Sequence, residues 1–239
     1  MGTTYSEALK ELRNAQKGRA KGAPGYSIYV NRKIGRFLAA FAHTLRLTPN
    51  QVTLVSALFT FTGIVLLATA PPTWYLGIAV WLLLALGYAW DSADGQVARL
   101  RGGGSVAGEW LDHFVDALKI SCLHLAVLIG WYRYFPIENE LWLLIPIGFA
   151  VVGAVTFFAM ILNDLLKGSR GVEKAVEEGG SSPLRSVLLL PTDYGVLCLS
   201  FAFWGIPIIF VGAYSLLFLA CAMFLVLAAI KWFKDMKKM

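Results

Sequence analysis

Four aspartates are the residues of this sequence whose type and spacing best suit chemistry. Asp91 and Asp94 lie three residues apart, and Asp112 and Asp116 lie four apart. On a helix that turns about 100° per residue, each spacing places its two carboxylates on one face. Four carboxylates that converge repel one another unless a cation compensates their charge, and hard oxygen ligands favour Mg²⁺ or Mn²⁺. The four residues therefore predict a divalent metal site.

The rest of the chain has the composition of a membrane protein. Of its 239 residues, 57% are hydrophobic and 15% are charged, which is too apolar for an ordinary soluble domain. A helix that crosses a hydrocarbon core of about 30 Å needs roughly 18 to 25 apolar residues. Six stretches have this length, some with polar interruptions: 51–70, 75–98, 109–132, 141–165, 187–205 and 207–231. We expect an all-α integral membrane protein with six transmembrane helices, in which a short loop brings the two aspartate pairs together.

The basic residues of the connections predict how the chain is oriented. Nine Lys and Arg residues precede the first stretch, and others occur between the second and third, between the fourth and fifth, and after the sixth. The opposite connections contain only Arg133. Because Lys and Arg are enriched on the cytoplasmic side, both termini and the four aspartates are expected to face the cytoplasm. Residues 1–25 lack the apolar core of a secretory signal, so no cleavage is expected.

The region ahead of the first stretch divides into two parts. Residues 1–25 are polar and basic and are expected to be flexible, whereas residues 26–47 mix apolar and basic side chains as in an amphipathic helix at a membrane interface. The six-helix domain then covers residues 48–239. A net charge of +6 is compatible with nucleic-acid binding, but the basic residues have no interleaved stacking aromatics and lie at membrane boundaries. We expect membrane lipids with anionic headgroups as partners, and no nucleic acid.

A longer pattern surrounds the four aspartates. It reads Asp91, two residues, Asp94, Gly95, two residues, Ala98, Arg99, eight residues, Gly108, three residues, Asp112, three residues and Asp116. This pattern resembles the signature of the class I CDP-alcohol phosphotransferase family, and its eight fixed positions coincide by chance at roughly one start point in 10¹⁰. The resemblance covers nearly the whole chain, because the family also has six spans, a cytoplasmic juxtamembrane amphipathic helix before them and the signature between spans two and three. It also implies a homodimer.

The resemblance implies a transfer reaction. An alcohol oxygen attacks the phosphorus of a CDP-linked donor, next to its lipid or alcohol group, and CMP leaves. Two metal ions about 3.5 to 4 Å apart suit such an in-line displacement. Asp91, Asp94 and Asp112 are then the expected metal ligands, and Asp116 lies close to the metals as the expected general base. His113 points about 100° away from Asp112 on a helix and is not expected to bind metal.

Five residues are expected to contact the CDP donor: Asn50, Gly95, Ala98, Arg99 and Gly108. Glycine at position 95 costs a helix about 1 kcal/mol relative to alanine, which suggests that a side chain would obstruct a nucleotide. Small residues at 98 and 108 keep two helix faces open, although a glycine at 108 also suits a helix entry. Arg99 is placed to bind a phosphate or to pair with a carboxylate. Asn50 matches the family's entry into the first span, although the Thr-Pro pair before it is also an ordinary helix start.

Four residues are expected near the acceptor alcohol: Lys119, Asp164, Arg170 and Arg185. Lys119 follows Asp116 by three residues and Asp112 by seven, so it should face the same cavity deeper in the membrane. It can hold a negative group of the acceptor or neutralise the aspartates, and a structural ion pair is the alternative. Arg170 and Arg185 flank a loop with a Gly-Ser run. They can bind a phosphorylated acceptor, or they can simply belong to the basic residues that are enriched at the cytoplasmic boundary of the membrane.

Several functions are compatible with these residues. The leading hypothesis is an enzyme of phospholipid synthesis that uses CDP-diacylglycerol as donor and a small polar alcohol as acceptor. An aminoalcohol phosphotransferase, with a CDP-choline or CDP-ethanolamine donor and diacylglycerol as acceptor, shares the same signature. A cation transporter lined by these carboxylates is a different class, since intramembrane Asp and Lys commonly mark ion paths. An inactive scaffold is a third class, and release of CMP separates the enzyme from both.

Overall fold

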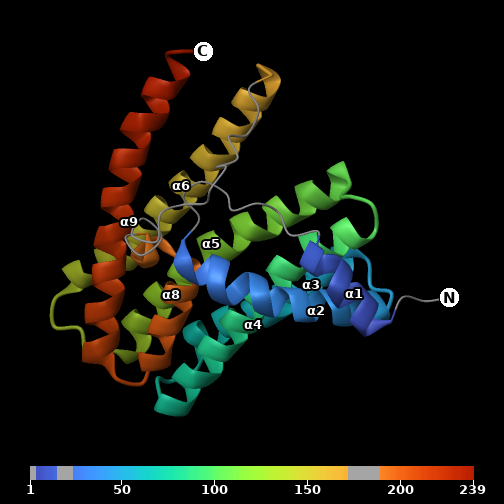
Figure 1. Cartoon of the computed structure of the whole chain (residues 1–239). Helices are drawn as coiled ribbons and strands as arrows, with labels where there is room; N and C mark the ends of the chain where they lie inside the picture. The colour runs from blue at the N-terminus through green and yellow to red at the C-terminus, as the bar shows by residue number, and fades with distance from the viewer. Residues whose placement is uncertain (1–3, 15–23, 172–188) are drawn as a thin grey trace.

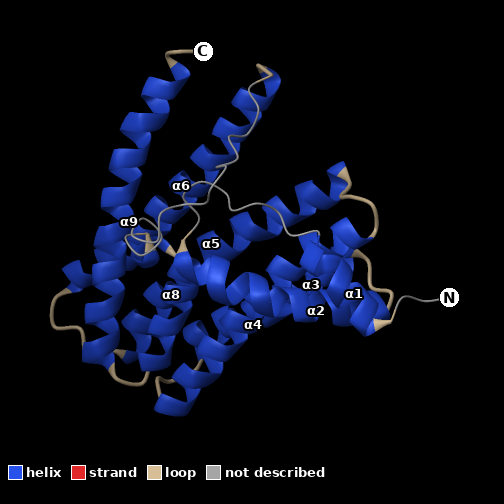
Figure 2. Cartoon of the chain, viewed as in Figure 1, coloured by secondary structure: helices blue, strands red, loops and turns tan. Residues whose placement is uncertain are grey.

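The computed structural model describes residues 4–14, 24–171 and 189–239, and within these ranges it contains helices and no strand (Figure 2). The N-terminal elements are α1 (Tyr5–Asn14), the π-helical turn η1 (Ser27–Asn31) and α2 (Arg32–Thr44). The long helices are α3 (Pro49–Thr69), α4 (Trp74–Leu100), α5 (Val106–Tyr134), α6 (Leu144–Ser169) and α9 (Pro207–Met236). The short elements are η2 (Glu140–Leu143), η3 (Leu190–Thr192), α8 (Tyr194–Ser200) and η4 (Phe201–Phe203).

Five helical segments among the described residues are long and apolar enough to cross a membrane: α3, α4, α5, α9 and the continuous segment Glu140–Ser169. They correspond to five of the six predicted stretches. The described part of the remaining stretch, 187–205, contains the shorter apolar segment Tyr194–Phe203. Large apolar side chains such as Phe158, Leu165 and Leu227 are 65 to 69% exposed, as expected for helices that face hydrocarbon. The protein is therefore an integral membrane protein, and the sixth span stays a prediction.

Helices α3 and α4 are held together by small and hydroxyl side chains. Ser56 of α3 donates a hydrogen bond from Oγ to the backbone oxygen of Gly87 in α4, at 2.9 Å. A Cβ atom at Gly87 would overlap the Thr60 hydroxyl and would lie 3.1 Å from the Ser56 backbone oxygen. A larger residue at position 87 would therefore separate the helices. The close approach buries the polar face of α3 against the turns of α4 that precede Asp91.

A cluster of aromatic side chains fills the other end of the helix bundle. Trp131 of α5, Trp204 after η4, and Phe210 and Tyr214 of α9 are fully buried. The ring centroids of Trp204 and Phe210 lie 4.9 Å apart, and those of Trp131 and Tyr214 lie 5.6 Å apart. Trp131 follows Asp112 by 19 residues, which is about 28 Å along a helix axis. This core anchors the C-terminal half of α5 and leaves its N-terminal half for the aspartates.

The N-terminal helices α1 and α2 pack against α4 (Figure 1). Thr4 caps α1 by accepting a hydrogen bond from the Glu7 backbone N–H at 3.3 Å. Thr4 also donates to the Glu7 carboxylate from its backbone N–H at 2.7 Å and from its hydroxyl at 2.8 Å, and these two hydrogen bonds hold the pKa of Glu7 below its ordinary value. Ala8 and Leu12, one turn apart, are buried with small residues of α2. Residues 5–14 of the segment that was expected to be flexible thus form a helix in the structure, and the flexibility of the segment stays a prediction. Elements η1 and α2 fill most of the predicted amphipathic helix, whose place at the interface stays a prediction.

Candidate active site

The loop between α4 and α5 brings the two aspartate pairs together. Gly102 and Gly103 have φ values of 88° and 133°, a left-handed region that side chains rarely adopt. This allows the chain to reverse direction between the end of α4 and the start of α5. Ser105 caps α5 by accepting a hydrogen bond from the Gly108 backbone N–H at 3.0 Å. The last turns of α4 and the first turns of α5 therefore lie next to each other.

Three of the aspartates offer oxygen atoms to a common point. One carboxylate oxygen from each of Asp91, Asp94 and Asp112 lies within 4.8 Å of the other two. Asp112, His113 and Asp116 form a second group with the same separation of ligand atoms. A set of carboxylate oxygens suits a hard divalent cation such as Mg²⁺ or Mn²⁺. The residues present therefore fit the metal that the sequence predicts.

Lys119 is the cation that the structure places among these carboxylates. Its ammonium forms ion pairs with Asp91 and with Asp116, the latter at 3.0 Å, and it donates to the Ser56 hydroxyl at 3.2 Å. The Lys119 side chain is 7% exposed, so it requires such partners. These contacts agree with neutralisation of the aspartates and equally with a structural ion pair, and a role of Lys119 at the acceptor stays a prediction.

Besides α4 and α5, which carry the aspartates, helix α3 contributes two hydroxyl groups that form hydrogen bonds within the cluster. Thr53 donates from Oγ1 to Asp94 Oδ2 at 2.8 Å, and Ser56 accepts from Lys119. Neither hydroxyl residue is among those expected from the sequence. The signal for them is the recurrence of Thr53, Ser56 and Thr60 every three to four residues in an otherwise apolar stretch, which marks one face of a helix. Partners of this kind orient the side chains that bind metal.

Of the residues expected at the donor, Gly95 adjoins open space, and Gly108 and Asn50 adjoin each other. A Cβ atom at Gly95 would meet only Arg99 Nη1, at 3.8 Å, so packing does not demand a glycine there. A Cβ atom at Gly108 would lie 3.1 Å from Asn50 Oδ1, which places these two residues in contact between α5 and α3. Ala98 is only 8% exposed and offers little surface to a ligand. The space at Gly95 leaves room for a ligand next to the aspartates.

Asn50 lies in a helix start that needs no ligand to explain it. Thr48 and Gln51 form a capping box, in which the Gln51 side chain accepts from the Thr48 N–H at 2.8 Å. The Thr-Pro sequence before Asn50 is thus ordinary helix initiation. The exposed Asn50 amide beside Gly108 is the part of this segment that is free to meet a donor.

The remaining residues expected at the acceptor lie on or after α6. Arg170 donates to the backbone oxygen of Met239 at 3.2 Å, and Asp164 is exposed on the last turns of α6. In Figure 1 these ends of α6 and α9 project from the top of the molecule, whereas the loop between α4 and α5 lies at the right. Arg185 lies outside the described residues. A role of these three residues at an acceptor stays a prediction.

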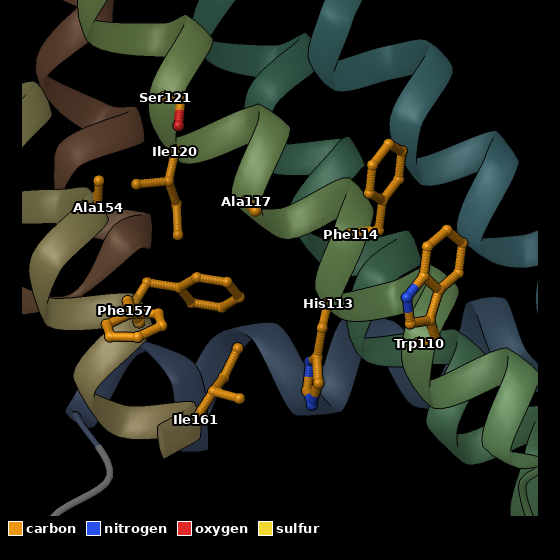
Figure 3. Close-up of a pocket in the computed structure, with 10 residues that line it drawn as sticks. Trp110, His113, Phe114, Ala117, Ile120, Ser121, Ala154, Phe157 and Ile161 are labelled. Carbon is orange, nitrogen blue, oxygen red and sulfur yellow. The ribbon is translucent and has the colours of Figure 1, made fainter. Parts of the chain in front are cut away.

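A pocket of about 310 Å³ lies between α5 and α6, on the side of His113 (Figure 3). Most of its lining is apolar, including Phe157 and Ile161 of α6. His113 Nδ1 lies 3.7 Å from Asp112 Oδ2, closer to the carboxylates than its helical position predicts. His113 and Ser121 are the polar residues of this lining, and it contains no carboxylate, so the aspartates remain the candidate reaction centre.

Comparison with known proteins assigns the chain to a family. A family model described as CDP-alcohol phosphatidyltransferase matches residues 46–233, a range that contains all four aspartates. A phosphatidylinositol phosphate synthase of Corynebacterium glutamicum is 42% identical over 93 residues, which cover 38% of this chain and 39% of that protein. Cholinephosphotransferase 1 of Xenopus laevis is 29% identical over 140 residues, which cover 53% of this chain and 33% of that protein. The matched regions thus span less than half the length of either relative.

Two crystal structures share the fold. The phosphatidylinositol phosphate synthase of Mycobacterium tuberculosis with CDP-DAG bound superposes with a TM-score of 0.54 and 21% identity, covering 82% of this chain and 90% of that one. The same enzyme in complex with manganese and citrate gives 0.52 and 21%, covering 85% and 89%. At 21% sequence identity, the similarity to these two structures is evidence for the fold alone. Because the family match extends over well more than half of the chain and includes the aspartate signature, this protein belongs to the CDP-alcohol phosphatidyltransferase family.

Proposed function

We propose that this protein transfers a phosphatidyl group from CDP-diacylglycerol to the hydroxyl group of a polar alcohol, with release of CMP, in phospholipid synthesis. The observation that carries this proposal is the convergence of Asp91, Asp94 and Asp112, whose carboxylate oxygens lie within 4.8 Å of one another. The Mycobacterium enzyme of the same fold binds CDP-DAG in one crystal structure and manganese in another, which supports both the donor and the metal.

The carboxylates are suited to hold two ions. Asp91, Asp94 and Asp112 would hold one Mg²⁺ or Mn²⁺, and Asp112 with Asp116 would hold a second. When bound, such ions supply positive charge for the donor diphosphate and for the charge that develops on the leaving oxygen. Thr53 fixes the orientation of Asp94 in advance through its hydrogen bond of 2.8 Å.

The side chains around the aspartates then have separate tasks. Asp116 accepts the proton of the attacking alcohol, whose oxygen forms a bond to phosphorus as the bond between that phosphorus and the CMP oxygen breaks. Lys119 orients Asp116 through its ion pair of 3.0 Å. The open space at Gly95 accommodates the nucleotide, and Arg99 contacts its diphosphate. Asn50 and Gly108 border the same donor. The small side chain of Ala98 leaves room for the nucleotide on its face of α4.

The proposal also includes the membrane arrangement. The chain would have six spans, with both termini and the aspartates in the cytoplasm, residues 26–47 along the interface, and a homodimeric assembly. In support, the apolar side chains of the η1 and α2 region lie on one exposed stripe: Val30, Ile34, Phe37, Phe41 and Leu45, which are 38 to 55% exposed. A stripe of this kind suits the boundary between headgroups and hydrocarbon.

Release of CMP tests the reaction. Purified protein is incubated with CDP-diacylglycerol, Mn²⁺ and a panel of polar alcohols, and we expect CMP release that requires both the metal and an acceptor. Asp116→Asn should lower turnover by a factor of about 10² to 10⁴ and retain part of the metal binding. Glu140→Gln changes an exposed acid in η2 and should leave turnover unchanged. Normal turnover in Asp116→Asn would remove this residue as the base, and no CMP release from any CDP-alcohol would refute the function.

The similarity to Xenopus cholinephosphotransferase 1 favours a second candidate, in which the donor is CDP-choline or CDP-ethanolamine and the acceptor is diacylglycerol. The same assay separates the two candidates, since each predicts CMP release from a different nucleotide. Release from CDP-choline in the presence of diacylglycerol, with none from CDP-diacylglycerol, would replace the first candidate by the second.

A further inference from the structure

Helix α2 is held tightly against the aspartate-bearing end of α4. A Cβ atom at Gly35 would lie 2.8 Å from Ser92 Oγ and 3.1 Å from the Ala89 backbone oxygen, so the two helices touch there. Gln96 donates from Nε2 to the Arg32 backbone oxygen at 3.3 Å. These contacts fix the backbone of Arg32 beside the turns of α4 that carry the first aspartate pair.

Arg32 and Arg36 lie between the core-facing side of α2 and its apolar stripe, and the Arg36 guanidinium lies 5.5 Å from the centroid of the Phe37 ring in that stripe. The face packed against the core contains the small residues Gly35, Ala39 and Ala42, and the apolar stripe lies on the other side of the helix. Arg32 and Arg36 are one turn apart, about 40° from each other around the axis, between these two faces. Both side chains are half-buried. The small residues of the core-facing side therefore leave both guanidinium groups outside the core, next to the end of α4.

Arg99 extends this basic surface to the metal ligands. Its Nη1 atom lies 3.8 Å from the position of a Cβ at Gly95, the residue that directly follows Asp94. Arg99 is within electrostatic range of Arg32, which repels it, and of Asp94, which attracts it. Positive charges from two helices thus meet at the edge of the aspartate cluster.

The three arginines have no close ionic partner, although Asp94 attracts Arg99 from a distance. Across the part of the chain that the structure describes, no carboxylate forms an ion pair with Arg32, Arg36 or Arg99. The Nε atoms of Arg36 and Arg99 are buried and have no hydrogen-bond partner among those residues. Buried donors without a partner cost stability, and neighbouring like charges add to that cost. A group with several anionic oxygens would relieve both, and phosphate is the group that best matches the guanidinium fork.

We propose that Arg32, Arg36 and Arg99 form a phosphate-binding site beside the metal ligands, with two of its three cations supplied by α2. The group it recognises is a phosphate ester, carried by a phosphorylated substrate or by the headgroup of a surrounding lipid. The site is distinct from the aspartates because it binds through guanidinium groups and needs no metal. If a substrate supplies the phosphate, this proposal rests on the proposed function; if a lipid headgroup supplies it, the proposal is independent of that function.

Titration with inorganic phosphate in the absence of metal tests this site. The full chain in maltoside micelles with EDTA is titrated calorimetrically. Arg32→Gln and Arg36→Gln should each weaken phosphate binding by about tenfold or more, the size of one lost charge-assisted hydrogen bond. Lys33→Gln removes the same charge from an exposed position of α2 and should bind as the wild type does. Equal binding by the wild type and both arginine variants would overturn the proposal.

Two further titrations identify the source of the phosphate. If a phosphorylated substrate occupies the site, Arg32→Gln weakens the binding of CDP-diacylglycerol in EDTA by a similar factor. If a lipid does, phosphatidylglycerol in the micelles competes with inorganic phosphate for the wild type, and the affinity for CDP-diacylglycerol stays unchanged in the variant. Arg32→Lys keeps the charge and replaces the glutamine variant if that variant does not fold. These readouts are separate from turnover, so absence of CMP release would refute the proposed function and leave this site standing.

Discussion

Replacement of Lys119 by methionine measures how much the buried ammonium stabilises the aspartate cluster. With an effective dielectric constant of about 20, the attraction between Lys119 and Asp116 at 3.0 Å is roughly 5 to 6 kcal/mol. Desolvation of the ammonium offsets much of this energy, and removal of one partner of a buried ion pair costs about 3 to 5 kcal/mol. Because Asp91 loses the same partner, we expect a cost in that range and a Tm lower by about 6 to 20 °C without metal.

Thermal unfolding followed by tryptophan fluorescence in detergent with EDTA is the measurement. Mn²⁺ should raise the Tm of Lys119→Met by more than it raises the Tm of the wild type, because the bound cation supplies charge that the variant lacks. Lys234→Met removes an exposed lysine of α9 and serves as the control, with a Tm close to that of the wild type. If Lys119→Met unfolds in EDTA within about 2 °C of the wild type, the ammonium does not balance the carboxylates, and the reasoning is refuted.

Three further changes test individual contacts. Thr53→Val removes the hydroxyl that donates to Asp94 at 2.8 Å and should weaken Mn²⁺ binding by about 10- to 100-fold in calorimetry, whereas Thr53→Ser should bind normally; equal affinity for all three proteins would contradict the role of the hydroxyl. Gly95→Ala places a methyl group in open space, so Tm should hold or rise while the affinity for CDP-diacylglycerol falls, and unchanged affinity would place the nucleotide elsewhere. Asp193→Ala removes acceptors for the backbone N–H groups of Ser27 at 2.9 Å and Gly195 at 3.0 Å, and thermal unfolding should show a loss of about 1 to 2 kcal/mol; no loss would mean that this cap does not stabilise α8.

The helices that could be predicted from the sequence are those that form because of their own length and apolar composition, without help from a particular neighbour. Five long helices were predictable from length and hydropathy, because a span of the membrane needs little else. Helix α1 was not, since its buried residues Ala8 and Leu12 are few and become informative only against the small face of α2. The predicted stretch 187–205 contains Pro191, and Asp193 caps α8, so the helix begins only at Tyr194.

The same distinction applies to the site. The convergence of Asp91, Asp94 and Asp112 was predictable because helical spacing and a short loop determine it. The contacts of Thr53 with Asp94 and of Lys119 with Asp91 depend on how α3, α4 and α5 are rotated about their own axes. That rotation is set by close approaches such as the one at Gly87, which hydropathy and spacing do not reveal.

The charge balance of the site supports the proposal of two metal ions. In their ionised forms the four aspartates and Lys119 carry a formal charge of −3. One divalent cation would leave this cluster negative and would still repel the diphosphate of a donor, whereas two would make it positive and attract it. Arg99 and Arg32 lie at the edge of the same cluster and add attraction on the side of Gly95. If the two proposed ions bind, the cluster would attract an anionic donor only after they are in place, and the donor would approach from the side of the arginines.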